Sequence, residues 1–228
     1  MRMSRRAAGA AAGVALALGA TTAVAAPAAN AAPASTTTAA AASTHKLGTK
    51  SLVAVLTADK SGFDSNGKDF DIVTAAVKAV LAAKPKSKVG VLANGKVALT
   101  AFVPNDQAFR LLVKDLTGKT FKKEADVFKA VASLGIPTVE KVLLYHVVPG
   151  ATIDSKAASK ANGVYLKTAA GLHIKVRVVK GKIYLQDLDP NSRNPQVIVV
   201  DVNKGNRQIA HGIDRVLRPL DLPPVAHH

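Results

Sequence analysis

Two internal histidines and one aspartate are the residues of this sequence best suited to chemistry. His211 and Asp214 could serve as the base and orienting acid of a hydrolase, and His146 could join them in a metal site. The sequence, however, contains no nucleophile elbow, metalloprotease helix, phosphate-binding glycine loop or dinucleotide fingerprint. Ile209, His211 and Ile213 share one face of a predicted strand, which favours a buried histidine held by a hydrogen bond. We therefore predict no enzyme activity, no metal and no cofactor.

The segment DLDPNSRNP places oxygen ligands at alternating positions, as a calcium-binding loop does. These ligands are Asp187, Asp189 and Asn191. The position that needs glycine holds Ser192, and the position of the bidentate acid holds Ile198. The segment is therefore predicted to be a polar turn that joins two strands.

The stretch TAFVPNDQAF, which begins at Thr100, could be an exposed binding loop or a structural joint. It contains an apolar run that ends at Pro104, where the ring fixes a corner. Asn105 or Asp106 can then satisfy the free N–H groups at the start of a helix. We favour the joint, in which the residues that face the core are Thr100, Phe102 and Phe109.

The elements that must position these residues begin with helices. A short helix is predicted in SLVAVLTADK, and the clearest helix covers residues 70–83, where apolar residues recur at helical spacing. Asp69 or Asp71 can cap this helix, and Pro85 ends it. A further helix is predicted to begin at Asn105 or Asp106, with Gly118 just past its end as a C-terminal cap. Other helices are predicted over residues 124–134 and after Pro137, with Thr138 as the cap.

Strands are predicted mainly in the last third of the chain. Earlier, Asn94-Gly95 between two apolar runs predicts a hairpin or a turn into a strand. GLHIKVRV alternates, with its apolar residues inward and His173, Lys175 and Arg177 outward. KGK is predicted to be a turn and IYLQD the strand that runs back from it. QVIVVDV, a longer run of apolar residues, is predicted to be a further strand. Because the helices precede the strands without a βαβ rhythm, we predict one α+β domain.

Positive charge dominates the composition. The chain has 31 Lys and Arg against 15 Asp and Glu, and three of the arginines lie in the first six residues, so the remainder carries 28 − 15 = +13. Such a surface attracts acidic cell-wall polymers, acidic polysaccharides or nucleic acid. The lysines are scattered in sequence and lack the aromatic residues on which single strands stack, so specific nucleic-acid binding is not expected. There is no cysteine, so the fold must depend on its core without disulfides.

The ends of the chain differ in composition from its centre. Residues 1–31 have the basic, apolar and Ala-x-Ala layout of a signal peptide of bacterial type. Residues 32–45 are predicted to be a low-complexity, flexible lead-in, residues 46–222 the domain and residues 223–228 a C-terminal tail. No other apolar run is long enough to span a bilayer. We expect a secreted monomer, either free or retained at the cell wall by its charge.

Three segments, in this order, resemble the signatures of the fasciclin-like domain family. They are TAFVPNDQAF, LLYHVVPG and IAHGIDRVLRP. The resemblance implies a wedge of two β-sheets with helices packed along one side. It also implies a secreted or cell-surface adhesion module without enzyme activity, whose partners are matrix or envelope polymers or another surface protein. The family-motif positions are Thr100, Phe102, Pro104, Phe109, Tyr145, His146, His211, Ile213 and Asp214.

The resemblance also points to one partner-binding position. In animal members, an aspartate and a following aliphatic residue just before the last signature are tied to receptor binding. Asp201-Val202 occupies that place here. The sequence departs from the family after it, with a segment one residue longer and Arg207-Gln208 where the family has Asn-Gly. A carrier of small apolar ligands, with a cavity between sheets and helices, and a hydrolase that uses His211 remain the alternatives.

Overall fold

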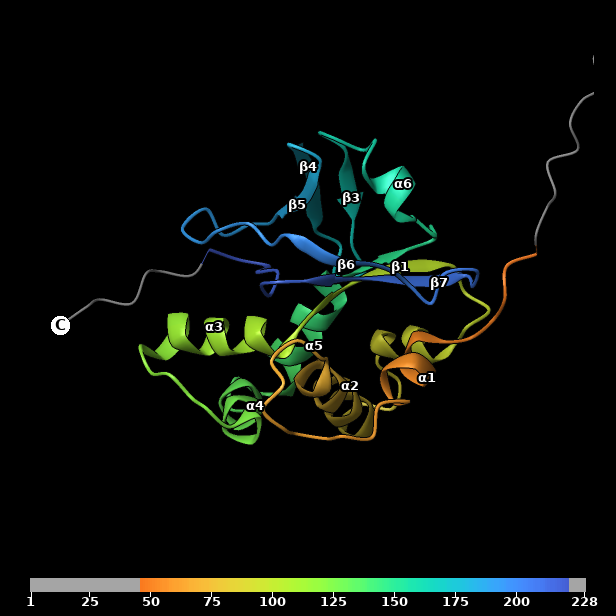
Figure 1. Cartoon of the computed structure of the whole chain (residues 1–228). Helices are drawn as coiled ribbons and strands as arrows, with labels where there is room; N and C mark the ends of the chain where they lie inside the picture. Colours follow the sequence, from red (N-terminus) through yellow and green to blue (C-terminus); the bar gives the residue numbers. More distant parts are fainter. Residues whose placement is uncertain (1–45, 222–228) are drawn as a thin grey trace, which may run out of the picture. The chain divides into compact units, whose positions relative to one another are not determined.

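The computed structural model describes residues 46–221, in which a four-stranded sheet separates most of the helices from a second, smaller sheet (Figure 1). This arrangement confirms the predicted α+β fold, a wedge of two sheets with helices along one side. The predicted signal peptide, lead-in and C-terminal tail lie outside the described residues. No helix within the described part of the chain is long and apolar enough to cross a bilayer.

Two parallel strands form the centre of the larger sheet. β1 (Leu99–Pro104) pairs in parallel with β7 (Gln208–Ile213), and the strand order is β2-β1-β7-β6. β2 (Val147–Pro149) and β6 (Val197–Val202) are the antiparallel edges. Every residue of β1 and β7 is buried, because both faces of this pair are covered.

The smaller sheet is a meander with one buried face. It contains β3 (Tyr165–Lys167), β4 (His173–Val179) and β5 (Lys182–Gln186), and the order is β3-β4-β5. The alternation predicted for GLHIKVRV is confirmed: Ile174 and Val176 are buried, whereas the residues between them are more exposed. This buried face packs with Phe102, Tyr145 and Ile213 into one core cluster, while the helices and the opposite face of the larger sheet form the other.

The helices follow the predicted periodicity, with differences at their ends. The third predicted helix ends at Ala132 rather than Leu134. The fourth begins at Ile136 with Gly135 at its N-cap, so the prediction of Thr138 as the cap is wrong. Pro137 lies in the first turn, where a backbone N–H would have no hydrogen-bond partner within the helix, so its absence costs nothing. The helices are α1 (Leu52–Leu56), α2 (Asp71–Ala83), α3 (Asp106–Thr117), α4 (Glu124–Ala132), α5 (Ile136–Tyr145) and α6 (Ser155–Ala158).

The turn at Asn94-Gly95 leads into β1 but does not form a hairpin. The apolar run before it is a 3₁₀-helix, η1 (Lys88–Ala93), so of the two alternatives only the turn into a strand is confirmed. The glycine is needed here for close approach, because a Cβ atom at Gly95 would lie 1.7 Å from the carbonyl oxygen of Thr49. The glycine that suggested a hairpin therefore accommodates the chain that leads into α1.

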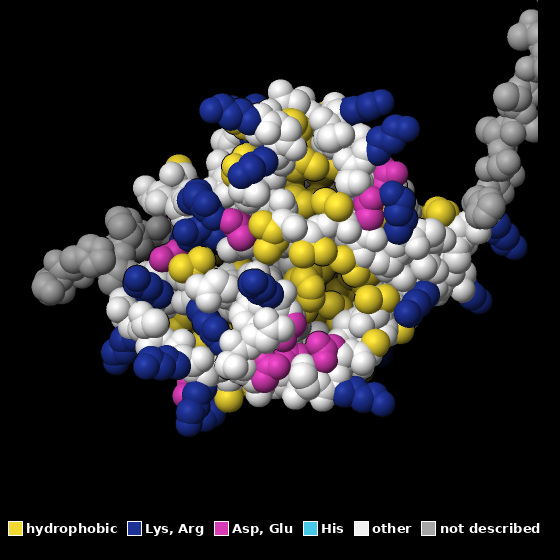
Figure 2. All heavy atoms as spheres, viewed as in Figure 1, with side chains coloured by type: hydrophobic (Ala, Val, Ile, Leu, Met, Phe, Trp, Pro, Cys, Tyr) yellow, Lys and Arg dark blue, Asp and Glu magenta, His cyan; other side chains and the backbone are white. Residues whose placement is uncertain are grey.

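The apolar run QVIVVDV is more exposed than its composition suggests. Ile198, Val199 and Val200 of β6 are each 40% or more exposed. β6 is an edge strand whose pairing with β7 is interrupted by two register shifts, so its side chains do not alternate regularly between two faces. Hydrophobic side chains are visible near the centre of Figure 2, in the region that β6 occupies in Figure 1.

Two neighbouring polar residues cap two different helices. Asn105 caps its own helix, α3, because its side chain accepts a hydrogen bond from Ala108 N at 2.9 Å. The carboxylate of Asp106 instead accepts from Asp71 N at 3.2 Å and Ile72 N at 2.9 Å, at the start of α2. The expectation that Asp69 or Asp71 caps α2 is therefore wrong, since the cap comes from a residue 35 positions away. At the other end of α3, Gly118 takes the left-handed conformation (φ +70°) that was predicted from its position.

The titration of Asp106 should make stability depend on pH. Burial, helped by the neighbouring Asp69 carboxylate, raises the pKa of Asp106 to about 8 from 3.8. The folded chain therefore holds a proton that the unfolded chain has released. The stability contributed by Asp106 is complete below about pH 3.8 and is lost as the pH rises through about 8.

We predict that Asp106→Asn removes this dependence. The wild-type free energy of unfolding should fall between about pH 7 and about pH 9, whereas that of the variant should stay nearly constant, because the amide keeps an acceptor for the cap without ionising. Asp106→Ala is the matched control: it should be less stable than Asp106→Asn by about 1 kcal/mol at both pH values, because the cap is lost. Urea unfolding at each pH measures all three proteins. An equal slope in wild type and Asp106→Asn would contradict the assignment.

Candidate functional site

His146 joins the end of α5 to the C-terminal segment. Its Nδ1 donates to the carbonyl of Val142 at 2.7 Å, and its Nε2 accepts from the backbone N–H of Leu217 at 2.9 Å. The ring is buried, and this burial lowers the pKa of His146 to about 4. Both ring nitrogens are therefore used by the backbone, and the side chain is neutral near pH 7.

His211 is held in the same manner in the middle of β7. Its Nε2 lies 2.8 Å from the carbonyl of Ile153, and its Nδ1 accepts from the backbone N–H of Asp201 at 3.3 Å. The ring is 1% exposed and stacks on Phe102, with ring centroids 5.9 Å apart. This is the buried, hydrogen-bonded histidine that the strand alternation favoured.

Asp214 does not orient either histidine. Its Oδ1 accepts from the backbone N–H of Gln196 at 2.7 Å, and its Oδ2 pairs with Arg193. His211 and Asp214 therefore do not form the base and acid of a hydrolase, because His211 is hydrogen-bonded to backbone groups and Asp214 to Gln196 and Arg193.

The other family-motif residues lie at structural joints. The hydroxyl of Thr100 donates to Ala151 O and accepts from Ile153 N, both at 2.8 Å, which ties β1 to the segment after β2. The buried hydroxyl of Tyr145 donates to His173 O at 2.9 Å and so links α5 to the smaller sheet. Burial raises the pKa of this hydroxyl. Phe102, Pro104, Phe109 and Ile213 are buried in the core.

The acidic loop is a turn locked by arginine. Asp189 is 1% exposed, pairs with Arg218 at 2.9 Å and accepts from the backbone N–H of Asn191. Asp187 accepts from the backbone N–H of Arg218 at 2.8 Å, and burial raises the pKa of Asp187 to about 6. These bonds hold the loop against the C-terminal segment, as expected for a polar turn rather than a calcium loop.

A cluster of three acids elsewhere in the domain resembles a cation site more closely than the acidic loop does. Asp69, Asp106 and Glu124 each place a carboxylate oxygen within 4.8 Å of the others. Arg110 pairs with Glu124 at 2.9 Å, and Asp106 caps α2. Burial also raises the pKa of Glu124. The guanidinium of Arg110 and the proton retained by Asp106 therefore compensate part of the charge of this cluster, which connects α2, α3 and α4.

The predicted partner-binding pair Asp201-Val202 lies at the end of β6, where a tight turn begins. Asp201 has a left-handed backbone (φ +60°), and its carboxylate accepts from Ser155 N and Ser155 Oγ, both at 2.7 Å, and from Lys204 Nζ at 2.7 Å. Partial burial acts to raise its pKa, but these bonds lower the pKa of Asp201 to about 2. Val202 packs against the helical core. The carboxylate is thus engaged internally, and contact of a partner with this pair stays a prediction.

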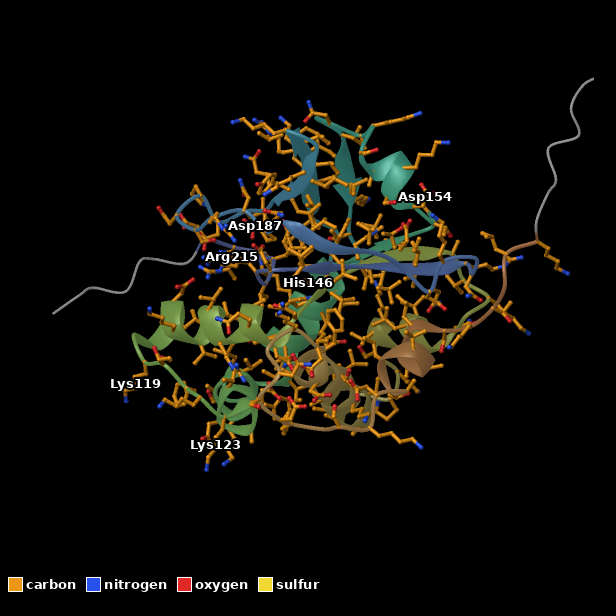
Figure 3. All side chains as sticks on the ribbon, viewed as in Figure 1. Lys119, Lys123, His146, Asp154, Asp187 and Arg215 are labelled. Atoms are coloured by element: carbon orange, nitrogen blue, oxygen red, sulfur yellow. The ribbon has the colours of Figure 1, made fainter. Side chains whose placement is uncertain are left out.

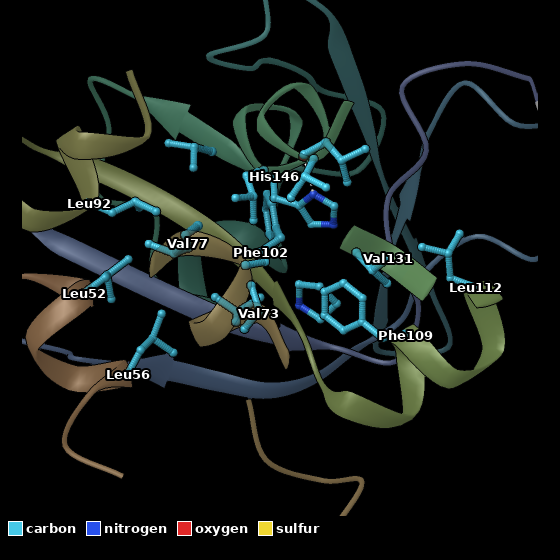
Figure 4. A pocket seen from close by; sticks show the side chains of 18 of the residues that line it. Leu52, Leu56, Val73, Val77, Leu92, Phe102, Phe109, Leu112, Val131 and His146 are labelled. Carbon is cyan, nitrogen blue, oxygen red and sulfur yellow. Dashed lines mark hydrogen bonds between the residues drawn. The ribbon is translucent and has the colours of Figure 1, made fainter. Parts of the chain in front are cut away.

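The apolar cavities are small. The cavity between the helices and the larger sheet has a volume of about 50 Å³ and is lined by Leu52, Val73, Phe109 and His146, among others (Figure 4). A second, of about 200 Å³, lies beside β7 and is lined largely by apolar residues, among them Leu52 and Leu56 of α1, Phe70 just before α2 and Ala210 of β7. Both are below the roughly 300 Å³ at which ligand pockets begin, which argues against a carrier of small apolar ligands.

The acids and the lysines occupy different environments. Asp106, Glu124 and Asp189 are almost fully buried. Every lysine of residues 46–221 except the half-buried Lys175 is exposed, and within this range only Lys84, Lys129 and Lys204 lie within ion-pair distance of a carboxylate. Lys and Arg side chains are accordingly spread over the face seen in Figure 2, with few acids between them.

Comparison with known proteins agrees with these observations. A model of the fasciclin domain family matches residues 70–219, more than half of the chain. The fold is similar to a solved structure described as a FAS1 domain pair from the insect cell adhesion molecule fasciclin I, with 17% identity and a TM-score of 0.52. The match covers 75% of this chain and 51% of that one, so this chain spans about half the length of the pair. A search of the curated proteins found no match.

We predict that His211 contributes to stability rather than to turnover. His211→Ala should lower the free energy of unfolding by about 3 kcal/mol, because it opens a cavity beside Phe102 and leaves two backbone groups without partners. His173→Ala is the control, since this histidine is exposed on β4 and should change stability by less than about 0.5 kcal/mol. Denaturant unfolding measures both. The catalytic interpretation would return if His211→Gln abolished a hydrolytic activity and left stability unchanged.

Proposed function

The chain belongs to the fasciclin domain family, and on that premise we propose that it is a secreted, non-enzymatic adhesion module that binds acidic polymers of the cell envelope or matrix through its basic surface. Fasciclin domains are generally adhesion modules of the cell surface and extracellular space, which sets the class of function. The choice of acidic polymers as partner comes from the charge of this particular chain.

The observation that carries the proposal is the separation of charge between interior and surface. Residues 46–221 carry 28 basic and 15 acidic residues, a net charge of +13. Three of the acids are almost fully buried, and two others, Asp115 and Asp214, are paired with arginine, whereas nearly all lysines extend into solvent without an acidic partner. Exposed, unpaired ammonium groups attract polyanions over about one Debye length.

Export is part of the same proposal. The layout of residues 1–31 supports removal as a signal peptide, after which the low-complexity lead-in of residues 32–45 would precede the domain of residues 46–222. The mature protein would then be free outside the cell or held at the wall by its charge.

Another surface protein is the alternative partner. The observation that favours it is the exposed apolar side of β6, formed by Ile198, Val199 and Val200, which is continuous in sequence with Asp201-Val202. A protein partner held through this strand would bind mainly by apolar contact, and its affinity would change little with salt. The salt dependence therefore separates the two partners.

We predict that the purified chain binds a soluble polyuronate and releases it as salt rises. Between about 50 mM and about 150 mM NaCl the affinity should fall by about tenfold or more, because the attraction is Coulombic and counterions are released. Isothermal titration calorimetry measures this change, with a neutral polysaccharide of similar length as the control. Equal binding of the neutral polymer, or an affinity that does not change with salt, would contradict the proposal.

A further inference from the structure

The outward face of the three-stranded sheet concentrates basic and aromatic residues that are dispersed in the sequence. Strand alternation directs Tyr165 and Lys167 outward from β3, and the strand register places Lys175 between Tyr165 and Gln186. In the next row, Arg177 of β4 lies opposite Tyr184 of β5. The outward set is completed by His173, Val179 and Lys182.

The outward face of these three strands contains no acid. None of β3, β4 and β5 includes an aspartate or a glutamate. None of the ion pairs found within the described part of the chain involves Lys167, Lys175, Arg177 or Lys182. The positive charge of the sheet is thus unopposed in its own plane. Lys and Arg side chains surround the sheet at the top of the view in Figure 2.

A shallow depression adjoins these residues. It has a volume of about 560 Å³, and besides the sheet residues Arg177, Val179, Tyr184 and Gln186 it is lined by the loop residues Ser192, Arg193 and Asn194. Two guanidinium groups therefore border it together with amide and hydroxyl groups. Arg193 is already paired with Asp214, so Arg177 is the guanidinium of this depression that has no acidic partner among the described residues.

We propose that this depression and the outward face of β3–β5 form a binding site for an acidic polysaccharide. Guanidinium groups bind carboxylates in a bidentate manner, and the neutral amide and hydroxyl groups beside them match the hydroxyl groups of a sugar ring. Outward residues along a strand are about 6.6 Å apart and neighbouring strands are about 4.8 Å apart, so cations recur across the face at intervals suited to a chain of charged sugars. The inference rests on the proposed function, since it assigns that polyanion binding to one face.

The chemistry of the face favours a glycan over a single-stranded nucleic acid. A stacking platform needs several free aromatic rings for successive bases. Here the Lys175 ammonium lies 5.0 Å from the centroid of the Tyr165 ring, which occupies one side of that ring. Tyr184 is half-buried between its neighbours. The face thus offers more charge and hydrogen-bond donors than stacking surface.

The test compares two variants of equal charge. The face variant is Lys175→Gln, Arg177→Gln and Lys182→Gln. The control variant is Lys119→Gln, Lys122→Gln and Lys123→Gln, three exposed residues around the start of α4, of which Lys119 and Lys123 project from the far end of the helical layer (Figure 3). Each variant removes three positive charges, and thermal unfolding confirms that each is folded.

Binding of an oligogalacturonate is then measured at low salt. The face variant should bind at least about tenfold more weakly than wild type, and the control variant within about threefold of it, because only the first set contacts the glycan. Equal losses in the two variants would overturn the site but leave binding by diffuse charge intact. If wild type does not bind the oligogalacturonate at all, the proposed function itself fails.

A single-stranded oligonucleotide of matched charge identifies the ligand class. It should compete with the oligogalacturonate only weakly, because the face lacks a stacking platform. Tighter binding of the oligonucleotide, abolished in the face variant, would overturn the glycan assignment in favour of nucleic acid.

Discussion

The parallel pairing of β1 with β7 is the interaction on which the rest of this structure depends. The two strands lie more than 100 residues apart in sequence, and both of their faces are covered, one by the helices and the other by the smaller sheet. A polar group in this pair has no access to water and must find its partner within the protein. Thr100, Gln208 and His211 meet this requirement by binding backbone groups of neighbouring segments. The side-chain amide of Gln208 links α1 to η1: its oxygen accepts from Leu52 N, and its nitrogen donates to Val91 O and Asn94 O.

The same constraint explains why histidines that resemble catalytic residues are structural. His146 and His211 each use both ring nitrogens on backbone groups, so neither has a lone pair or proton available for a substrate. The family signatures are the places where helices, sheets and the C-terminal segment join. Their polar residues are there because chain ends and strand ends leave backbone groups that must be satisfied.

The proposed function, by contrast, depends on surfaces that the core leaves free. Three acids are drawn into the interior, where Asp106 caps α2, Glu124 pairs with Arg110, and Asp189 fixes a loop by pairing with Arg218. The lysines remain outside with few partners. In the smaller sheet, the pleat sorts apolar residues to the core and basic residues to solvent, so the burial that forms the sheet also creates its charged face.

The sequence by itself determined the class of fold, the main helices, the β4–β5 hairpin and the family, because these depend on local periodicity, turn residues and three distinctive segments. It also indicated Asn105 and Gly118 as caps, since capping of this kind involves residues only three or four positions apart. It did not indicate Asp106 as the cap of α2, the exposure of β6 or the engagement of Asp201, because each depends on partners brought together from distant parts of the chain.

The basic and aromatic face was hidden for the same reason. Along the chain, Tyr165, Lys175, Arg177 and Tyr184 are dispersed, and the alternation of β4 alone showed only that Lys175 and Arg177 point outward. Register between β3, β4 and β5 places the tyrosines beside the cations, and the packing of the loop brings Arg193 to the same depression. In β4, local pattern thus decided which side chains face solvent, and tertiary pairing decided which residues of β3 and β5 lie beside them, because strand register is fixed by contacts between segments rather than within them.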